Sequence, residues 1–112
     1  STNNTLNLKI KMGGKASEVS HFQNMNFTLP SNITNGDIML ETASVTYDNT
    51  TIGVTAANGV KLNKDDVIYL VKADNINSTT IANDEESVLN GAAIVKLDGN
   101  DFKPIHSQNI SS

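Results

Sequence analysis

The chain of 112 residues contains no cysteine, so disulfide bonds, thiolate nucleophiles and cysteine-type zinc sites are excluded together. Arginine is also absent, and all 8 basic residues are lysine. No guanidinium can therefore bind a phosphate or carboxylate through two parallel hydrogen bonds. The formal net charge of -4 argues against binding by phosphate neutralisation, and we expect no nucleic-acid partner. Tryptophan is missing, and three Phe and two Tyr are few aromatic rings for a compact sandwich core.

Long apolar runs are missing as well. The longest apolar runs, at 67–71 and 92–95, have only five and four residues, against the ~20 needed to span a bilayer. Residues 1–5 lack the basic start and apolar stretch of a signal peptide. Because both ends are rich in Asn and Ser, we expect the chain to be a segment of a longer protein.

Alternation of apolar and polar residues is the dominant pattern in what is present. It predicts half-buried β-strands, and the continuous apolar run at 67–71, rich in β-branched residues, predicts a strand buried on both faces. The predicted strands cover residues 6–12, 25–29, 38–41, 44–47, 51–55, 67–71 and 93–97. Two stretches are compatible with a helix: residues 84–90, of one or two turns, and residues 16–22, for which irregular or short-strand structure is favoured.

Turn residues separate these strands. Gly13-Gly14 follows the first, Pro30 ends the second, and Asn35-Gly36-Asp37 precedes the third. Asp48-Asn49 and Asn58-Gly59 flank the fifth. We therefore predict one all-β unit spanning residues 1–112.

Two architectures fit the uneven strand spacing: a coiled parallel β-solenoid and an antiparallel β-sandwich. Asn, Ser and Thr together supply 37 of the residues. In a parallel coil, side chains of Asn and Thr at the corners can hydrogen-bond in ladders between successive turns, and such a core needs few rings. This favours the coil, with the sandwich as the alternative.

A resemblance supports the coil. Residues 19–30 read VSHFQNMNFTLP, residues 33–40 read ITNGDIML, and residues 59–71 read GVKLNKDDVIYLV. This order resembles the passenger region of Gram-negative type V autotransporter adhesins, over residues 5–75. The resemblance implies a right-handed parallel β-helix, exported unfolded and displayed at the bacterial cell surface. It also implies a C-terminal barrel in the outer membrane and a position late in the passenger, where the segment could nucleate folding.

The function expected from this resemblance is non-enzymatic. The segment would form a rigid stalk or a contact surface for cell adhesion, and its partner would be a receptor or glycan on a host or neighbouring cell. Open coil ends would favour self-association. The alternative is a small extracellular carbohydrate-binding β-sandwich module, with Tyr47 or Tyr69 exposed in a groove.

Candidate sites in the sequence have simpler structural interpretations. His21 and His106 are the only histidines, and no G-x-S-x-G motif accompanies them, so we interpret His21 as a surface or half-buried strand residue. Residues 98–101, 84–86 and 64–66 concentrate acidic groups, which we interpret as a turn, a solvated helix start and a turn. The sequence thus predicts no catalytic residue, no metal site and no cofactor.

Overall fold

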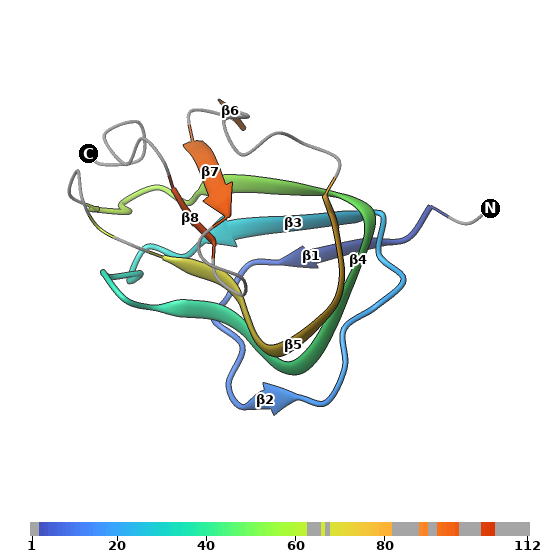
Figure 1. Ribbon diagram of the computed structural model, residues 1–112. Coiled ribbons are helices and arrows are strands. Elements are labelled where there is room, and N and C mark those ends of the chain that lie inside the picture. Colours follow the sequence, from blue (N-terminus) through green and yellow to red (C-terminus); the bar gives the residue numbers. More distant parts are fainter. Residues whose placement is uncertain are drawn as a thin grey trace.

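The computed structural model describes residues 3–62, 66, 68–81, 88–89, 92–96 and 102–104, and every regular element among them is a strand (Figure 1). The strands are β1 (Thr5–Leu8), β2 (Lys15–Ala16), β3 (Asn24–Leu29), β4 (Ile38–Ala56), β5 (Tyr69–Ile81), β6 (Val88–Leu89), β7 (Ala92–Lys96) and β8 (Phe102–Pro104). The prediction of an all-β fold is confirmed for these residues.

Five strands form one curled parallel sheet. β1 pairs with β3, and β3 pairs with the last part of β4. β2 pairs with the first part of β4, which pairs in turn with β5. All four pairings are parallel, and Leu6 and Met25 run in the same direction in register. This sheet therefore lacks the antiparallel arrangement that the sandwich alternative requires.

The chain returns to the same place on the sheet in successive passes. We call β1, β2 and the chain up to residue 22 the first pass; β3 and the first part of β4 form the second pass, and the rest of β4 and β5 form the third. Thr5, Asn24 and Thr51 are neighbours across the three passes, as are Lys15, Glu41 and Lys72. Each pass thus lies directly on the one before it.

The loop at one corner accounts for most of the uneven strand spacing. In the first pass it connects β1 to β2, in the second it connects β3 to β4, and in the third it connects β4 to β5. The three loops comprise residues 9–14, 30–37 and 57–68, so they lengthen from pass to pass. The paired strands keep their register on either side of these loops.

β4 joins three of the predicted strands into one element of 19 residues. It bends at the corners, where its register with β5 shifts between Val45 and Thr46 and again between Asp48 and Thr50. Asn49 adopts a left-handed backbone with φ of 52° at the second bend. Asn tolerates this conformation better than most residues, which explains why a predicted turn bends the strand without ending it.

Buried threonines stabilise the bends. The Thr50 hydroxyl donates to the carbonyl of Phe22 at 2.7 Å and accepts from the backbone N–H of Asp48 at 3.1 Å. The Thr42 hydroxyl donates to the carbonyl of Ser44 at 2.9 Å. Both side chains are fully buried, so these bonds satisfy polar groups that would otherwise be costly inside the fold.

The first predicted strand, residues 6–12, was too long. β1 ends at Leu8, and Ile10 is 67% exposed although the alternation placed it in the core. The chain turns a corner here: the backbone N–H of Met12 already bonds to the carbonyl of Met39, on another side of the sheet. Alternation does not continue around a corner, so Ile10 projects to the outside.

The segment after β5 forms a separate antiparallel sheet with the order β6-β7-β8. β7 matches the strand predicted at 93–97, whereas Val88 and Leu89 form a strand where a helix was predicted. These two residues pair with β7, and pairing overrides a weak local helix preference. The rest of that predicted helix, residues 84–87 and 90, lies outside the described residues. This sheet contacts β4 and β5, the strands of the third pass.

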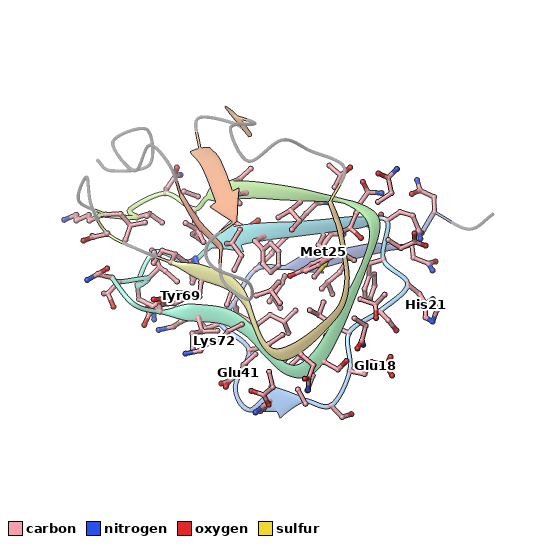
Figure 2. The ribbon with its side chains drawn as sticks, in the orientation of Figure 1. Glu18, His21, Met25, Glu41, Tyr69 and Lys72 are labelled. Atoms are coloured by element: carbon pink, nitrogen blue, oxygen red, sulfur yellow. The ribbon has the colours of Figure 1, made fainter. Side chains whose placement is uncertain are left out.

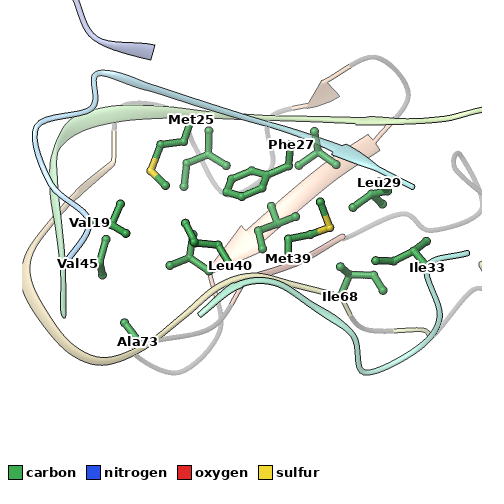
Figure 3. Close-up of a cluster of buried hydrophobic side chains, with 14 of the residues drawn as sticks. Val19, Met25, Phe27, Leu29, Ile33, Met39, Leu40, Val45, Ile68 and Ala73 are labelled. Atoms are coloured by element: carbon green, nitrogen blue, oxygen red, sulfur yellow. The ribbon is translucent and has the colours of Figure 1, made fainter. Parts of the chain in front are cut away.

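The core is built from stacked apolar side chains (Figure 3). Leu6, Met25 and Ile52 are aligned across the passes, as are Leu8, Phe27 and Val54. The buried members of the core are Val19, Met25, Phe27, Leu29, Ile33, Met39, Leu40, Val45, Tyr47, Ile52, Val54, Val60, Leu62, Ile68, Leu70, Val71 and Ala73. Aliphatic stacking thus fills the interior with few rings, as the composition indicated.

Replacing Phe27 with alanine should destabilise the fold by about 3–5 kcal/mol, because a large side chain is removed from the middle pass. The matched change Ile10→Ala should cost less than about 0.5 kcal/mol, since Ile10 is exposed. Urea unfolding followed by circular dichroism measures both. Equal losses for the two variants would contradict the stacked core.

Candidate functional site

The outer side of β1, β3 and the last part of β4 carries uncharged amides and hydroxyls. Alternate residues of a strand point to opposite sides of the sheet, and the register brings outward residues of the three strands together. We call this surface the amide–hydroxyl face, formed by Asn3, Thr5, Asn7, Asn24, Asn26, Thr28, Thr51 and Thr55.

Side-chain hydrogen bonds connect the passes on this face. The amide of Asn24 donates to the side-chain oxygen of Asn3 at 2.9 Å, and the amide of Asn26 donates to that of Asn7 at 3.1 Å. The predicted ladders therefore form along these strands, and at the first bend of β4 the amide of Asn77 donates to the hydroxyl of Ser44 at 2.6 Å.

Gly53 occupies the third position of the Asn7–Asn26 ladder. A Cβ atom there would lie 2.7 Å from the side-chain oxygen of Asn26, so glycine leaves room for the carboxamide. One column further, the hydroxyls of Thr28 and Thr55 lie 3.3 Å apart. The face is therefore closely packed with neutral polar groups.

A charged column follows another side of the sheet. Lys15, Glu41 and Lys72 lie in register on β2, β4 and β5, so charges of opposite sign are adjacent. Figure 2 shows Glu41 and Lys72 pointing outward on this side. The hydrogen bond from Lys15 to Asp74 is the main reason that the pKa of Lys15 lies above its usual value. Desolvation lowers this pKa by less than the hydrogen bond raises it, and the charges of Asp74 and Glu41 raise it further. The ammonium of Lys72 lies 5.6 Å from the centre of the Tyr69 ring.

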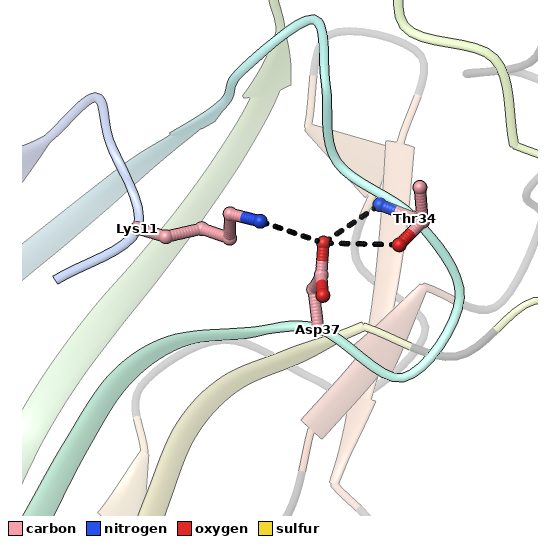
Figure 4. Close-up of polar contacts among 3 residues, drawn as sticks. All are labelled: Lys11, Thr34 and Asp37. Atoms are coloured by element: carbon pink, nitrogen blue, oxygen red, sulfur yellow. Dashed lines mark hydrogen bonds and ion pairs between the residues drawn. The ribbon is translucent and has the colours of Figure 1, made fainter. Parts of the chain in front are cut away.

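A third polar group connects the first two passes at the corner loops (Figure 4). One carboxylate oxygen of Asp37 accepts from Lys11 Nζ at 3.1 Å, from Thr34 N–H at 2.8 Å and from the Thr34 hydroxyl at 3.2 Å. Gly36, with φ of 88°, allows the tight turn that brings Thr34 and Asp37 together and confirms the predicted turn. Burial raises the pKa of Asp37, but these bonds and the charge of Lys11 outweigh it, so the pKa lies below its usual value.

The histidine and tyrosine candidates that the structure describes have different surroundings. His21 is exposed at a corner with φ of 68°, outside any strand, and its carbonyl accepts from the side chain of Asn4. Tyr47 is buried in the core, where desolvation raises its pKa. Tyr69 is half-buried under Lys72. Neither tyrosine lies exposed in the sugar-binding groove that the sandwich alternative would require.

Other predicted candidates cannot be placed. His106, residues 98–101, residues 84–86 and residues 64–65 lie outside the described residues, while Asp66 is half-buried. Within the described part of the chain, no three His, Asp or Glu side chains gather to hold a metal ion. In the same part, no helix is long and apolar enough to cross a membrane.

No family model, no curated protein and no solved structure matches this chain.

The sequence analysis did not predict that the charged column would align or that Lys11, Thr34 and Asp37 would come together. Both depend on which residue of one pass lies on which residue of the next, over separations of 26 to 31 residues. The one local signal was the Asn-Gly-Asp turn, which places an acid directly after a glycine.

Replacing Asp37 with asparagine should make the free energy of unfolding fall less steeply as the pH decreases from 7 to 3. The lowered pKa means that the Asp37 carboxylate contributes stability above its unfolded pKa of about 3.9, and that this contribution is lost as the pH falls through the folded value. At pH 7 the variant should lose about 1 kcal/mol, and at pH 3 much less. Urea unfolding at both pH values measures the difference.

Asp74→Asn provides the control, because the Asp74 side chain is 57% exposed in its ion pair with Lys15. An exposed pair contributes little, so this variant should lose less than about 0.5 kcal/mol at pH 7. If the two variants behave alike, the Asp37 group is no more important than an ordinary surface ion pair.

Proposed function

We propose that the chain is a non-enzymatic segment of a bacterial cell-surface autotransporter adhesin passenger, serving as a rigid stalk or contact surface. In this proposal the curled parallel sheet is a stretch of right-handed parallel β-helix. The observation that carries it is the stacking of successive passes in parallel register around one apolar core. The residues that resemble adhesin passengers supply β3, the beginning of β4 and the beginning of β5.

Rigidity follows from how the passes are connected. The second pass hydrogen-bonds to both neighbours along two stretches of sheet, and its apolar side chains pack against both. Bending the stack would stretch hydrogen bonds and open the core on one side at the same time. A stack of this kind keeps its length without disulfides, which suits a surface stalk.

The same connections support folding after export. A chain without cysteine cannot be locked by a disulfide before it crosses a membrane. Each pass offers a strand edge on which the next can form, so folding can proceed along the chain. The antiparallel β6–β8 sheet pairs residues close in sequence and contacts the third pass. Local pairing closes quickly, so this sheet is a suitable nucleus.

The amide–hydroxyl face is the surface we assign to adhesive contact. Its neutral donors and acceptors suit hydrogen bonding to a glycan or a polar receptor surface on a host or neighbouring cell. Several groups already bond to one another, so the face is ordered before a partner arrives. Preorganisation of this kind lowers the entropy cost of binding.

The proposal is tested by placing the chain between a secretion signal and an autotransporter barrel in a Gram-negative host. We expect the segment to reach the cell surface, to resist external protease there, and to stay resistant after Ile10→Ala. Phe27→Ala should be exported but cleaved at least about tenfold faster, because proteolysis follows the population of opened chains. Surface antibody labelling and timed proteolysis measure both.

Two results would count against it. Retention of the unaltered segment inside the cell would argue against an exported passenger. Rapid cleavage of the unaltered segment at the surface would argue against a rigid stack. Beads coated with the purified chain, applied to a glycan array and to cultured cells, test the contact role separately.

A further inference from the structure

Two turns in the described part of the chain contain asparagine followed by glycine. Asn35-Gly36 forms the centre of the turn Thr34–Asp37, in the second corner loop. Asn58-Gly59 forms the centre of the turn Ala57–Val60, in the third. In each turn the last N–H donates to the first carbonyl, at 3.1 Å and 3.3 Å respectively. The glycines have φ of 88° and 91° and neither asparagine has a positive φ, so both turns are of type II.

Asparagine followed by glycine can modify itself where the backbone is able to move. The glycine nitrogen loses its proton and attacks the side-chain carbonyl carbon of the asparagine. The side-chain nitrogen leaves as ammonia, and a succinimide ring remains. Water then opens the ring at either carbonyl carbon and gives aspartate or isoaspartate, in which the main chain runs through the former side-chain carbons. Glycine favours the first step because it has no Cβ to obstruct the approach.

The reacting groups of Asn58 and Gly59 are open to solvent, since both residues are exposed. The hydrogen bond that closes the turn uses neither of the two. Among the residues that the structure describes, none bonds to the Asn58 side chain or to the Gly59 N–H. Only the backbone keeps them apart: in a type II turn the ψ angle of Asn58 is about +120°, which directs the Gly59 nitrogen away from the Asn58 side chain. The reaction therefore requires only that this turn opens.

The turn at Asn35 is held closed by additional bonds (Figure 4). The carboxylate of Asp37 accepts from the N–H and the hydroxyl of Thr34, which joins the two ends of the turn, and also from Lys11. Asn35 has a further polar interaction of its own. At the position that corresponds to Asp37, the turn at Asn58 has Val60, which cannot accept such bonds. Opening is therefore less costly at Asn58.

The chain is anchored on either side of Asn58-Gly59. The N–H of Ala57 donates to the carbonyl of Leu29 at 2.9 Å, and Val60 is buried in the core. Opening of the turn, and the longer main chain of isoaspartate, are therefore confined to two exposed residues. The stacked passes remain intact when this site changes.

We propose that Asn58 is a site of spontaneous deamidation in the folded protein, with isoaspartate as the main product. Water is the co-reactant and ammonia the leaving group, so the reaction needs no enzyme. The new carboxylate is ionised at neutral pH and changes the formal net charge of the chain from -4 to -5, because a neutral side chain becomes an anion. The third corner loop thus acquires a charge as the protein ages. This proposal does not depend on the chain being an adhesin.

The test follows the purified chain during incubation at about pH 8. Proteases that cleave after lysine and glutamate release residues 19–41 and 42–61 as separate peptides, which carry Asn35 and Asn58 respectively. Mass spectrometry measures the replacement of amide by acid in each peptide, and fragmentation between the carbon atoms of the inserted main chain identifies isoaspartate. We expect Asn58 to react at least about fivefold faster than Asn35 in the folded chain.

Urea distinguishes local opening from unfolding of the whole chain. In urea that unfolds the protein, the two sites should react within about twofold of each other, because both are then flexible Asn-Gly pairs. At urea concentrations below the unfolding transition, the rate at Asn58 should not change, since opening of one turn exposes little surface. Asn58→Gln should abolish the change at this site, because its longer side chain disfavours ring closure, and should leave the rate at Asn35 unaltered.

Three results would overturn the proposal. The first is equal rates at Asn35 and Asn58 in the folded chain. The second is an unmodified Asn58 after a time in which the unfolded chain has reacted. The third is a rate at Asn58 that rises in step with global unfolding, which would show that the folded turn itself does not react.

Discussion

Parallel pairing in register is the constraint on which the rest of this structure depends. It places Leu6 on Met25 and Met25 on Ile52 inside the sheet, while outside it places Asn7 on Asn26. Like side chains therefore meet like, and short aliphatic residues fill a continuous interior. A shift of one residue in any strand would exchange its inner and outer sides, burying amides and exposing the apolar side chains.

The same register separates three kinds of surface. One side of the sheet is neutral and internally hydrogen-bonded, another carries charges that alternate in sign, and the corner loops hold the carboxylate of Asp37 against Lys11. None of these contains a set of groups arranged for acid–base or nucleophilic chemistry in the described part of the chain. Their common property is order, since each of them contains side chains that bond or pair with one another within the fold. An ordered polar surface suits recognition and spacing, which is why we propose a contact or stalk role.

Sequence alone predicted the elements better than their connections. Met25–Leu29 was recognised because alternation is clear and Pro30 marks its end. The Asn35-Gly36 turn was recognised because glycine readily adopts the left-handed backbone that a tight turn uses. Ile10 was misplaced because alternation does not show where a chain turns a corner. Val88 and Leu89 were misplaced because a short acidic start resembles a helix cap, while their pairing with β7 depends on residues further along. The charged column required the register itself, which a sequence with passes of unequal length does not reveal.

The exposed positions of the corner loops can vary while the strands on either side stay paired. The chain crosses this corner three times, in loops that lengthen from residues 9–14 to 30–37 and 57–68, while the strands on either side stay aligned. Added length is accommodated outside the paired strands, although Ile33 in the second loop and Val60, Leu62 and Ile68 in the third contribute side chains to the core. At the exposed positions of these loops, new epitopes can arise in evolution and binding peptides can be grafted in a row, with a spacing fixed by the neighbouring strands, about 4.8 Å for each pass.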